Sequence, residues 1–511
     1  MSNKNSVCTG DERHSAKSDE FIVRSEKVES LKAGGISPWP ESKPISHTCS
    51  DLTAVDVQEG GEATAESFKV AGRVIAKREH GKTIFATIQD RSGTIQLYLK
   101  KDVLGDDNFY KLKLFVDLGD FLWVDGPLFI TRTGEKTVKV AEWTILSKSL
   151  HPLPEKFHGL VDTEQRYRQR YLDLISNSES REKFIQRSKI VRGMRKFLGD
   201  KDFLEVETPM LHPIPGGATA KPFVTHHNAY DMDLFLRIAP ELYLKRLVVG
   251  GLERVFEINR SFRNEGVSTR HNPEFTMLEF YMAHGDYIAG MELTEQLICS
   301  IAKTVFFGKT LFEYGTKKIS FETPFPRLSV REALVKIGRF NPSGLEPETI
   351  DIVLKDNSVE LKNSEASYGE KLFTLFEEKV EAKIIQPTFI TGYPIEVSPL
   401  TKRDPNDETT APRFELFAAG MELANGYNEL NDPFDQADRF RKQAKAKVAG
   451  DDEAHHFDKD YVTALEHGLP PTVGVGIGID RLVMLLTNTA SIKDVILFPT
   501  MKKKETAEEN K

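Results

Sequence analysis

Cysteine is scarce in this chain of 511 residues. Only Cys8, Cys49 and Cys299 occur, and they stand far apart in the sequence. They cannot form a disulfide framework or a paired-cysteine zinc motif, so we expect a protein of the reducing cytoplasm. The histidine pairs at 226–227 and 455–456 also lack a nearby cysteine. We interpret them as surface residues rather than metal ligands.

Long apolar runs are absent as well. No uninterrupted stretch is long enough to span a bilayer, which disfavours a membrane protein. The polar N-terminus lacks the apolar core of a secretory signal peptide. Apolar residues nevertheless make up 39% of the chain, enough to build a sizeable core.

The familiar nucleotide-binding motifs are missing too. Gly-Lys-Thr triplets begin at Gly81 and Gly308, but Ala76 and Lys303 occupy the positions where a P-loop needs its first glycine. Residues 474–478 are rich in glycine, yet they lack the GxGxxG spacing and the βαβ context of a Rossmann site. Any nucleotide site must therefore be of another kind.

Charge is nearly balanced, with 69 basic and 77 acidic residues and a net charge of −8. This excludes a wholly basic coat for nucleic acid. Residues 66–150 differ, because they contain 14 Lys and Arg against 11 Asp and Glu. That excess favours contact with phosphate, although charge alone is equally compatible with an ordinary solvated surface.

The first 150 residues divide into a polar region and a β-rich region. Residues 1–65 read as a disordered leader over 1–20, a short helix over 25–33 that ends at Gly34-Gly35, and a linker over 36–61. Residues 66–150 predict a small barrel of the oligonucleotide-binding (OB) kind, or a generic barrel without a ligand. Strands are expected over 68–77, 83–89, 94–99, 121–124, 128–131 and 137–143, with a helical insert at 102–114.

A proline-rich boundary at 151–154 precedes a second region, 151–501, in which strands and helices alternate without βαβ regularity. Helices are expected over 164–174 and 180–198, and a helical insert near 329–382. The charged tail, 502–511, is expected to be disordered. The fold class predicted for the whole chain is therefore α+β.

A predicted hairpin carries the first set of unusual residues. Residues 255–265 alternate, which places Arg263 and Glu265 on one strand face, and residues 266–273 form a long loop. The returning strand presents Phe275, Met277, Glu279 and Tyr281 on a single face. Buried acids beside an arginine are costly unless a charged ligand pairs with them. A salt-bridge network on a solvated face remains the alternative.

A second predicted hairpin joins residues 413–417 to 421–425. A tight turn centred on Ala418-Ala419 places Glu415 directly opposite Glu422. Two adjacent carboxylates repel each other, so a cation is expected between them, most simply Mg²⁺. Beyond this pair, Asn425, Tyr427 and Glu429 alternate on one face.

The third piece is the glycine-rich stretch 474–479, followed by Arg481 at the start of an apolar helix. Glycines let the backbone approach a ligand closely. Arg481 fits either a surface position that caps the helix or a phosphate clamp, and the two hairpins favour the clamp.

These residues resemble a known family. Segments 203–209, 260–265 and 476–481 resemble the three signature motifs of class II aminoacyl-tRNA synthetases. Segments 167–174, 215–218, 239–243 and 421–426 extend the likeness to lysyl-tRNA synthetases of the bacterial type, from about residue 25 to residue 499. Bacterial members often carry phenylalanine where this chain has Tyr427.

The resemblance implies an N-terminal OB barrel that binds the anticodon, followed by a six- or seven-stranded antiparallel sheet flanked by helices. It also implies a homodimer, with Pro209 near the subunit interface. The implied reaction uses ATP and Mg²⁺ to convert L-lysine to lysyl-adenylate, and then transfers lysine to the 3′-terminal adenosine of tRNA(Lys).

The resemblance also implies residue roles. Arg263 stabilises the charge that grows at the α-phosphate, and no general base is needed because the attacking lysine carboxylate is already ionised. Arg263, Glu265 and Arg481 are the expected catalytic residues. The expected ATP contacts are Arg263, Glu265, His271, Asn272, Phe275, Glu415, Gly478 and Arg481, and Glu415 and Glu422 are the expected Mg²⁺ ligands.

For lysine, the expected contacts are Gly217 and Glu241 at the α-amine, Glu279, Tyr281 and Glu429 at the ε-ammonium, and Arg263, Asn425 and Tyr427 nearby. For the anticodon they are Arg78, Phe85, Gln96 and Glu135.

Three alternative functions compete with this assignment. An OB-fold RNA-binding protein with a degenerate synthetase body would have lost one of Arg263, Glu265, Glu415, Glu422 or Arg481, and all five are present. A ligase that attaches lysine to a protein would lack the barrel. An aspartyl or asparaginyl synthetase would not be expected to line its amino-acid pocket with Glu279 and Glu429.

Overall fold

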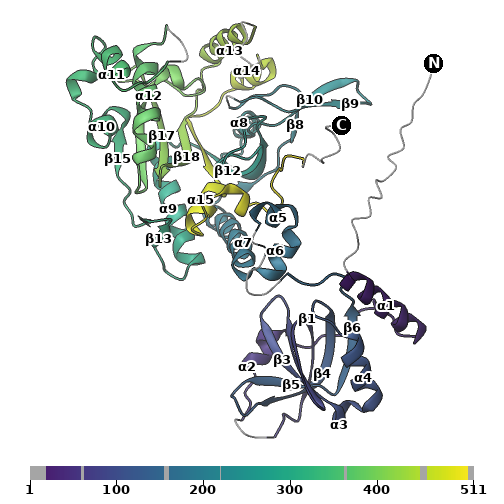
Figure 1. Cartoon of the computed structure of the whole chain (residues 1–511). Coiled ribbons are helices and arrows are strands. Elements are labelled where there is room, and N and C mark those ends of the chain that lie inside the picture. The colour runs from purple at the N-terminus through teal and green to yellow at the C-terminus, as the bar shows by residue number, and fades with distance from the viewer. Residues whose placement is uncertain are drawn as a thin grey trace, which may run out of the picture. The chain divides into compact units, whose positions relative to one another are not determined.

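The chain folds into two compact units in a computed structural model (Figure 1). Unit 1 covers Met1–Leu160 and unit 2 covers Val161–Lys511. The structure describes residues 19–58, 62–154, 160, 162–218, 220–361, 365–448 and 457–503. The predicted leader up to residue 18, the tail from residue 504, and His455-His456 lie outside these residues.

Unit 1 contains a six-stranded sheet that closes into a barrel. Its strands are β1 Ser67–His80, β2 Thr83–Gln89, β3 Thr94–Lys100, β4 Phe121–Ile130, β5 Lys136–Lys139 and β6 Glu142–Ser147. Their order is β1-β2-β3-β5-β4-β6, and pairing of β1 with β4 closes the barrel. Alternate residues, such as Ile84, Ala86 and Ile88 of β2, are buried in its core. This period-two burial is what the sequence pattern predicted.

The predicted helical insert is present as α3 Lys101–Leu104 and α4 Asp106–Phe115. Two strand predictions were wrong in detail. Gly126-Pro127 lies inside the single strand β4 and does not separate two strands. A Cβ atom on Gly126 would come within 2.1 Å of the carbonyl oxygen of Lys139, so this glycine permits a close strand approach and does not mark a turn. The expected strand 137–143 is divided between β5 and β6.

The N-terminal helix, α1 Asp19–Ala33, begins earlier than predicted and ends just before Gly34, as predicted. Arg24 is buried and donates to the carbonyl oxygens of Leu118, Ser149 and His151, which holds α1 against the barrel.

The expected linker was wrong in part, because it contains α2 Cys49–Ala54. A capping box between Thr48 and Asp51 starts this helix. Cys49 and Leu52 are buried in the barrel core, so this segment is part of the folded unit.

Unit 2 is built on an eight-stranded sheet with the order β15-β16-β17-β18-β19-β12-β11-β7. The strands are β7 Leu204–Glu205, β11 Arg254–Phe262, β12 Glu274–Ala283, β15 Arg327–Ser329, β16 Thr388–Pro394, β17 Thr410–Ala418, β18 Met421–Asn428 and β19 Thr472–Gly478. The central strands are antiparallel, and the short edge strands β7 and β15 pair in parallel with their neighbours. These edge strands make the sheet wider than the six or seven strands expected, and the predicted α+β class is confirmed.

Two smaller sheets accompany the large one. One contains β8 Leu211–His212, β9 Val224–His227 and β10 Met232–Leu236, and the other contains β13 Leu311–Tyr314 and β14 Lys317–Ser320. The helices outside the insert are α5 Thr163–Arg168, α6 Arg170–Ser176, α7 Ser178–Gly199, α8 Glu241–Val249, α9 Tyr287–Val305, α13 Pro433–Val448, α14 Lys459–Glu466 and α15 Ile479–Leu486. Apolar residues of α7, α9 and α15 pack with the central strands in the largest core.

The predicted helical insert has its own core. It contains α10 Val330–Lys336, α11 Ile350–Asp356 and α12 Tyr368–Lys379, which Figure 1 shows grouped near the β15 edge of the sheet. Capping boxes at Ser329 and Ser367 start α10 and α12. The 3₁₀ turns of unit 2 are η1 Pro342–Leu345, η2 Glu381–Lys383, η3 Ile395–Val397 and η4 Ile492–Asp494.

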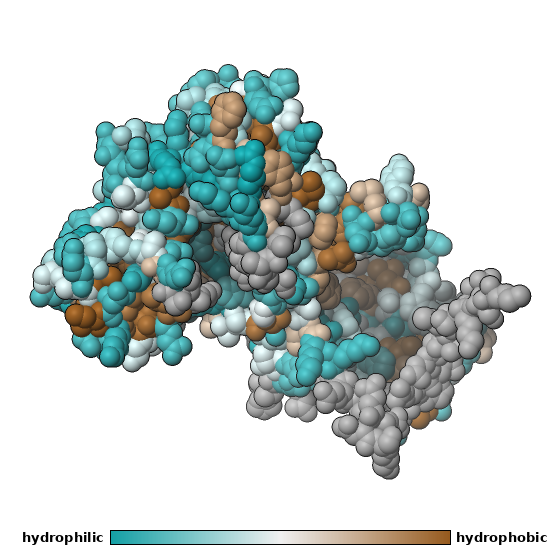
Figure 2. Space-filling view, turned by 90° about the horizontal axis from the view of Figure 1, so that it is seen from above, coloured by the Kyte–Doolittle hydropathy of each residue, from teal (hydrophilic) through white to brown (hydrophobic). Residues whose placement is uncertain are grey.

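Within the described part of the chain, no helix is both long and apolar enough to cross a membrane. Figure 2 shows hydrophilic residues over most of the visible face, with hydrophobic residues in small separate patches.

Candidate active site

One cavity of about 500 Å³ in unit 2 brings together residues from all three predicted segments. It is lined by the inward faces of β12, β17, β18 and β19, and by the loops beside them. Every residue predicted for the ATP, lysine and metal sites lines this cavity: Gly217, Glu241, Arg263, Glu265, His271, Asn272, Phe275, Glu279, Tyr281, Glu415, Glu422, Asn425, Tyr427, Glu429, Gly478 and Arg481.

The β11–β12 hairpin supplies one wall. As predicted, Phe275, Met277, Glu279 and Tyr281 share the face of β12 that lines the cavity.

The prediction that Arg263 and Glu265 lie on a strand was wrong, because β11 ends at Phe262. The chain turns there, and the amide of Glu265 donates to the carbonyl oxygen of Arg263 at 2.9 Å. The Arg263 guanidinium lies 5.1 Å from the centre of the Phe275 ring, and its burial lowers its pKa.

The β17–β18 hairpin supplies the opposite wall, and its predicted register was wrong. The turn residues are Ala419 and Gly420, both in the left-handed region with φ of 56° and 74°. Phe417 therefore pairs with Glu422, and a bulge brings Glu415 opposite Asn425. Glu415 and Glu422 nevertheless line the same cavity.

Arg413 forms an ion pair with Glu415, a role that the sequence did not lead us to assign. Its guanidinium donates to Glu415 Oε1 at 2.6 Å and to Asn425 Oδ1 at 3.2 Å. The Tyr393 hydroxyl donates to Glu415 Oε2 at 2.9 Å. Burial raises the pKa of Glu415 to about 7, Arg413 opposes this rise, and Glu422 adds to it. The signal was present, since Arg413 and Glu415 are two residues apart on one strand face.

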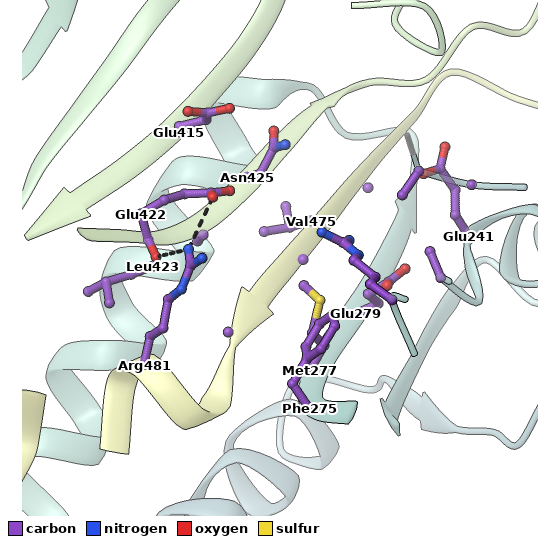
Figure 3. A pocket seen from close by; sticks show the side chains of 18 of the residues that line it. Glu241, Phe275, Met277, Glu279, Glu415, Glu422, Leu423, Asn425, Val475 and Arg481 are labelled. Atoms are coloured by element: carbon purple, nitrogen blue, oxygen red, sulfur yellow. Dashed lines mark hydrogen bonds and ion pairs between the residues drawn. The ribbon is translucent and has the colours of Figure 1, made fainter. Parts of the chain in front are cut away.

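Arg481 is not a surface capping residue. Its Nη1 donates to the backbone oxygen of Glu422 at 2.9 Å and to Glu422 Oε2 at 3.2 Å (Figure 3). Its Nη2 lies 3.2 Å from His271 Nε2. Burial, with Arg481 nearby, lowers the pKa of His271, which favours the neutral ring as acceptor. Arg481 thus links the loop after β11 to β18.

The other end of the cavity is acidic. Figure 3 shows Glu241 and Glu279 apart from the cluster of Glu415, Glu422 and Arg481. The Tyr427 hydroxyl donates to Glu241 Oε1 at 2.9 Å.

Burial raises the pKa of Glu279 to about 8, and nearby Glu241 adds to the rise. Burial also raises the pKa of Glu429 to about 8, although Lys245 opposes that rise. Such carboxylates favour a cation as their partner.

Lys245 was also missed. It lies one helical turn after Glu241 on α8, and its ammonium pairs with Glu241 at 2.6 Å and with Glu429. The spacing of four residues between Glu241 and Lys245 on a helix was the available signal.

Glu415 and Glu422 line the same cavity, and Glu422 adds to the rise in the pKa of Glu415. Among the described residues there is no group of three or more His, Cys, Asp or Glu side chains suited to a metal ion. A cation held by Glu415 and Glu422 would need further oxygen ligands, from water or from a bound anion such as a phosphate. His226 pairs instead with Asp233 at 2.9 Å on the protein surface, in agreement with its interpretation as a surface residue.

The barrel of unit 1 carries an aromatic row on its outer face. Phe85 is half-buried and points away from the core, which its neighbours Ile84 and Ala86 enter. Its ring centre lies 5.2 Å from that of Tyr98, which lies 5.5 Å from that of Phe129. Phe85 is therefore not a core residue.

Polar side chains adjoin this aromatic row. Arg78 pairs with Phe85 across β1 and β2. Gln96 donates to Glu135 at 2.5 Å and accepts from Thr137 at 2.9 Å. All four predicted anticodon residues thus belong to unit 1, on or beside these strands.

Comparison with known proteins agrees with both units. Residues 162–502 match the family model described as tRNA synthetases class II (D, K and N). Residues 68–146 match the OB-fold nucleic acid binding domain, which confirms the predicted kind of barrel.

Curated relatives match almost the full length. The chain is 51% identical over 498 residues to a protein of Bacillus cytotoxicus named Lysine–tRNA ligase, covering 96% of this chain and 99% of the relative. Proteins of the same name from Bacillus cereus strain B4264 and Bacillus mycoides are each 50% identical with the same coverage. The chain belongs to the class II tRNA synthetases of the D, K and N group.

Proposed function

We propose that this protein is a lysine–tRNA ligase, which activates L-lysine with ATP and transfers it to the 3′-terminal adenosine of tRNA(Lys). The observation that carries the proposal is the division of charge within one cavity. Glu241, Glu279 and Glu429 gather at one end, Arg481 pairs with Glu422 toward the other, and Arg263 lies near both Glu279 and Glu422. A substrate with ammonium groups fits the first end and a polyphosphate fits the second.

In the first step, the lysine carboxylate attacks the α-phosphorus of ATP. A bond forms between a carboxylate oxygen and the phosphorus, the bond to the bridging oxygen breaks, and pyrophosphate leaves with its electron pair. Both reactants are anionic, so Arg263 stabilises the charge that develops between them. No residue needs to remove a proton.

We assign the remaining ATP contacts as the family resemblance implies, and all of these residues line the cavity. Phe275 stacks on the adenine, Asn272 and Glu265 orient the adenosine, and His271 contacts the triphosphate. Arg481 reaches the γ-phosphate from the start of α15, where Gly478 leaves the backbone uncovered.

The lysine contacts follow from the acidic end. Gly217 and Glu241 bind the α-amine, Glu279 and Glu429 bind the ε-ammonium with Tyr281, and Asn425 and Tyr427 complete the pocket. A related aspartate or asparagine enzyme would have to bind an anionic or neutral side chain. The two buried carboxylates assigned to that side chain, Glu279 and Glu429, argue against both.

We propose Mg²⁺ as the cofactor, held by Glu415 and Glu422 together with phosphate oxygens of ATP. The bound ion would neutralise the triphosphate and orient it. The raised pKa of Glu415 supports this assignment, because a buried carboxylate that lacks enough positive charge gains from a cation.

We propose that the barrel of unit 1 reads the anticodon of tRNA(Lys). The half-buried ring of Phe85 offers a platform for base stacking, with Arg78 beside it for phosphate. Gln96 and Glu135 provide hydrogen-bonding groups for base edges.

We also propose that the protein is a cytoplasmic homodimer. Apolar side chains are exposed around β7–β10: Leu204, Met210, Leu211, Val224 and Tyr230. Pro209, at the end of the first motif, lies among them. Light scattering should give about twice the chain mass of 57.7 kDa, and a mass of one chain would contradict this assignment.

The amino-acid assignment is tested by ATP–pyrophosphate exchange with each of the twenty amino acids. Lysine should support exchange far more strongly than any other, because only lysine carries ammonium groups at both ends of an unbranched chain. Stronger exchange with aspartate or asparagine would overturn the proposed function in favour of those relatives.

Glu422→Ala should lower the rate of lysine-dependent exchange by about a hundredfold and raise the Mg²⁺ concentration needed, because one carboxylate ligand is lost. Glu313→Ala, which removes an exposed acid on β13, serves as the matched control. A Glu422→Ala protein with the exchange rate and Mg²⁺ dependence of this control would show that Glu422 does not bind the cation.

Phe85→Ala should lower kcat/KM for aminoacylation of tRNA by about ten- to a hundred-fold, because a stacked base is lost. Lysine-dependent exchange without tRNA should be unchanged, since the cavity lies in unit 2. Phe307→Ala, at a 95% exposed position of unit 2, controls for loss of a ring. Equal losses in both assays would indicate a damaged fold, and no loss in either would place anticodon recognition elsewhere.

A further inference from the structure

The ammonium group of one of the protein's own lysines, Lys245, adjoins the acidic end of the cavity without lining it. Lys245 of α8 is fully buried, and its Nζ pairs with Glu241 Oε1 at 2.6 Å and with Glu429. The rings of Tyr427 and Tyr461 lie 5.8 Å from Nζ on other sides. Burial lowers the pKa of Lys245, but Glu241 and Glu429 more than reverse this effect, so its ammonium stays charged.

Lys245 pairs with only one oxygen of each carboxylate. On Glu241, Oε1 pairs with the Lys245 ammonium and accepts from the Tyr427 hydroxyl, which leaves Oε2 for another donor. On Glu429, Oε2 pairs with Lys245, while the buried Oε1 has no hydrogen-bond partner in the part of the chain that the structure describes.

Gly474 makes room for this arrangement. A Cβ atom at that position would come within 2.1 Å of Glu429 Oε1. Both carboxylates line the cavity and Lys245 does not, so each acid turns one oxygen to Lys245 and keeps one for a ligand.

The charges then match one class of substrate. Glu241, Glu279 and Glu429 carry three negative charges when ionised, and Lys245 offsets one of them. Two remain, which equals the number of ammonium groups on a diamino acid. Arg263, which also lines the cavity, is left for the substrate carboxylate.

We infer that Lys245 is a positioning residue for amino-acid selection, which pairs with Glu241 and Glu429 and orients them so that the pocket accepts an α-amino acid with a second ammonium. The inference rests on the proposed function and adds to it a residue that does not touch the substrate. Loss of its charge should act on substrate affinity and leave the chemical step intact.

The groups that face Glu429 determine how lysine binding depends on pH. They are Lys245 and Glu241 from α8, Glu279 and Tyr281 from β12, Tyr427 from β18 and Tyr461 from α14. Lys245 is the only cation among them. Without it, Glu241 and Glu429 repel each other and the pKa of Glu429 rises further, so a higher pH is needed to ionise the pocket.

Lys245→Met keeps the length of the side chain and removes its charge. In ATP–pyrophosphate exchange it should raise KM for lysine by about ten- to a hundred-fold with kcat nearly unchanged. The ratio of mutant to wild-type KM should fall as pH is raised from about 6.5 to about 8.5. Lys336→Met is the matched control, because Lys336 also follows a glutamate by four residues but is 58% exposed.

A double variant guards against a folding defect. Lys245→Met/Glu429→Gln removes the repulsion, so it should regain the thermal stability that Lys245→Met loses. Loss of Lys245 should raise KM for lysine much less in the Glu429→Gln background than in the wild-type protein, because Lys245 acts in part through Glu429.

The outcomes separate the two claims. A loss that is independent of pH, or a double variant whose KM shows full additivity, would overturn the role of Lys245 while the proposed function stands. Absence of lysine-dependent exchange in the wild-type protein would overturn the proposed function, and the inference with it.

Discussion

Buried negative charge in the cavity is the constraint on which the rest of this site depends. Carboxylates in such surroundings are stable as anions only when cations face them. The protein supplies some of these cations itself, since Arg413 pairs with Glu415 and Lys245 pairs with Glu241 and Glu429. A cationic substrate and a metal ion can neutralise the negative charge that remains.

Strand geometry places these charged side chains in the cavity. Period-two alternation on β12 and β18 directs side chains from two adjacent hairpins into the same space, and β19 lies between them. Gly474 on β19 leaves the volume that Glu429 and Tyr281 occupy, because a Cβ atom there would come within 2.4 Å of Tyr281. The glycine-rich strand is therefore needed for the acidic end of the cavity as well as for nucleotide approach.

Much of this site could be predicted from sequence, because alternation assigns residues to faces regardless of exact register. Prediction from alternation failed where the local geometry departs from that of an ideal strand. The Ala419-Gly420 turn and the following bulge moved Glu415 opposite Asn425, and β11 ended before Arg263. Local signals existed for Lys245, in its spacing from Glu241, and for α2, in its capping box. The pairing of Lys245 with Glu429 and the burial of α2 in the barrel core are tertiary contacts, which local patterns do not reveal.

The central claim is that charge at the far end of the cavity selects lysine. It is tested most directly by comparing kcat/KM for exchange with lysine and with norleucine, which has the same chain length but no terminal ammonium, in the wild-type protein and in Glu429→Gln. The wild-type protein should prefer lysine by about 10⁴-fold, and Glu429→Gln should lower that preference at least about tenfold. An unchanged preference in Glu429→Gln would contradict the account.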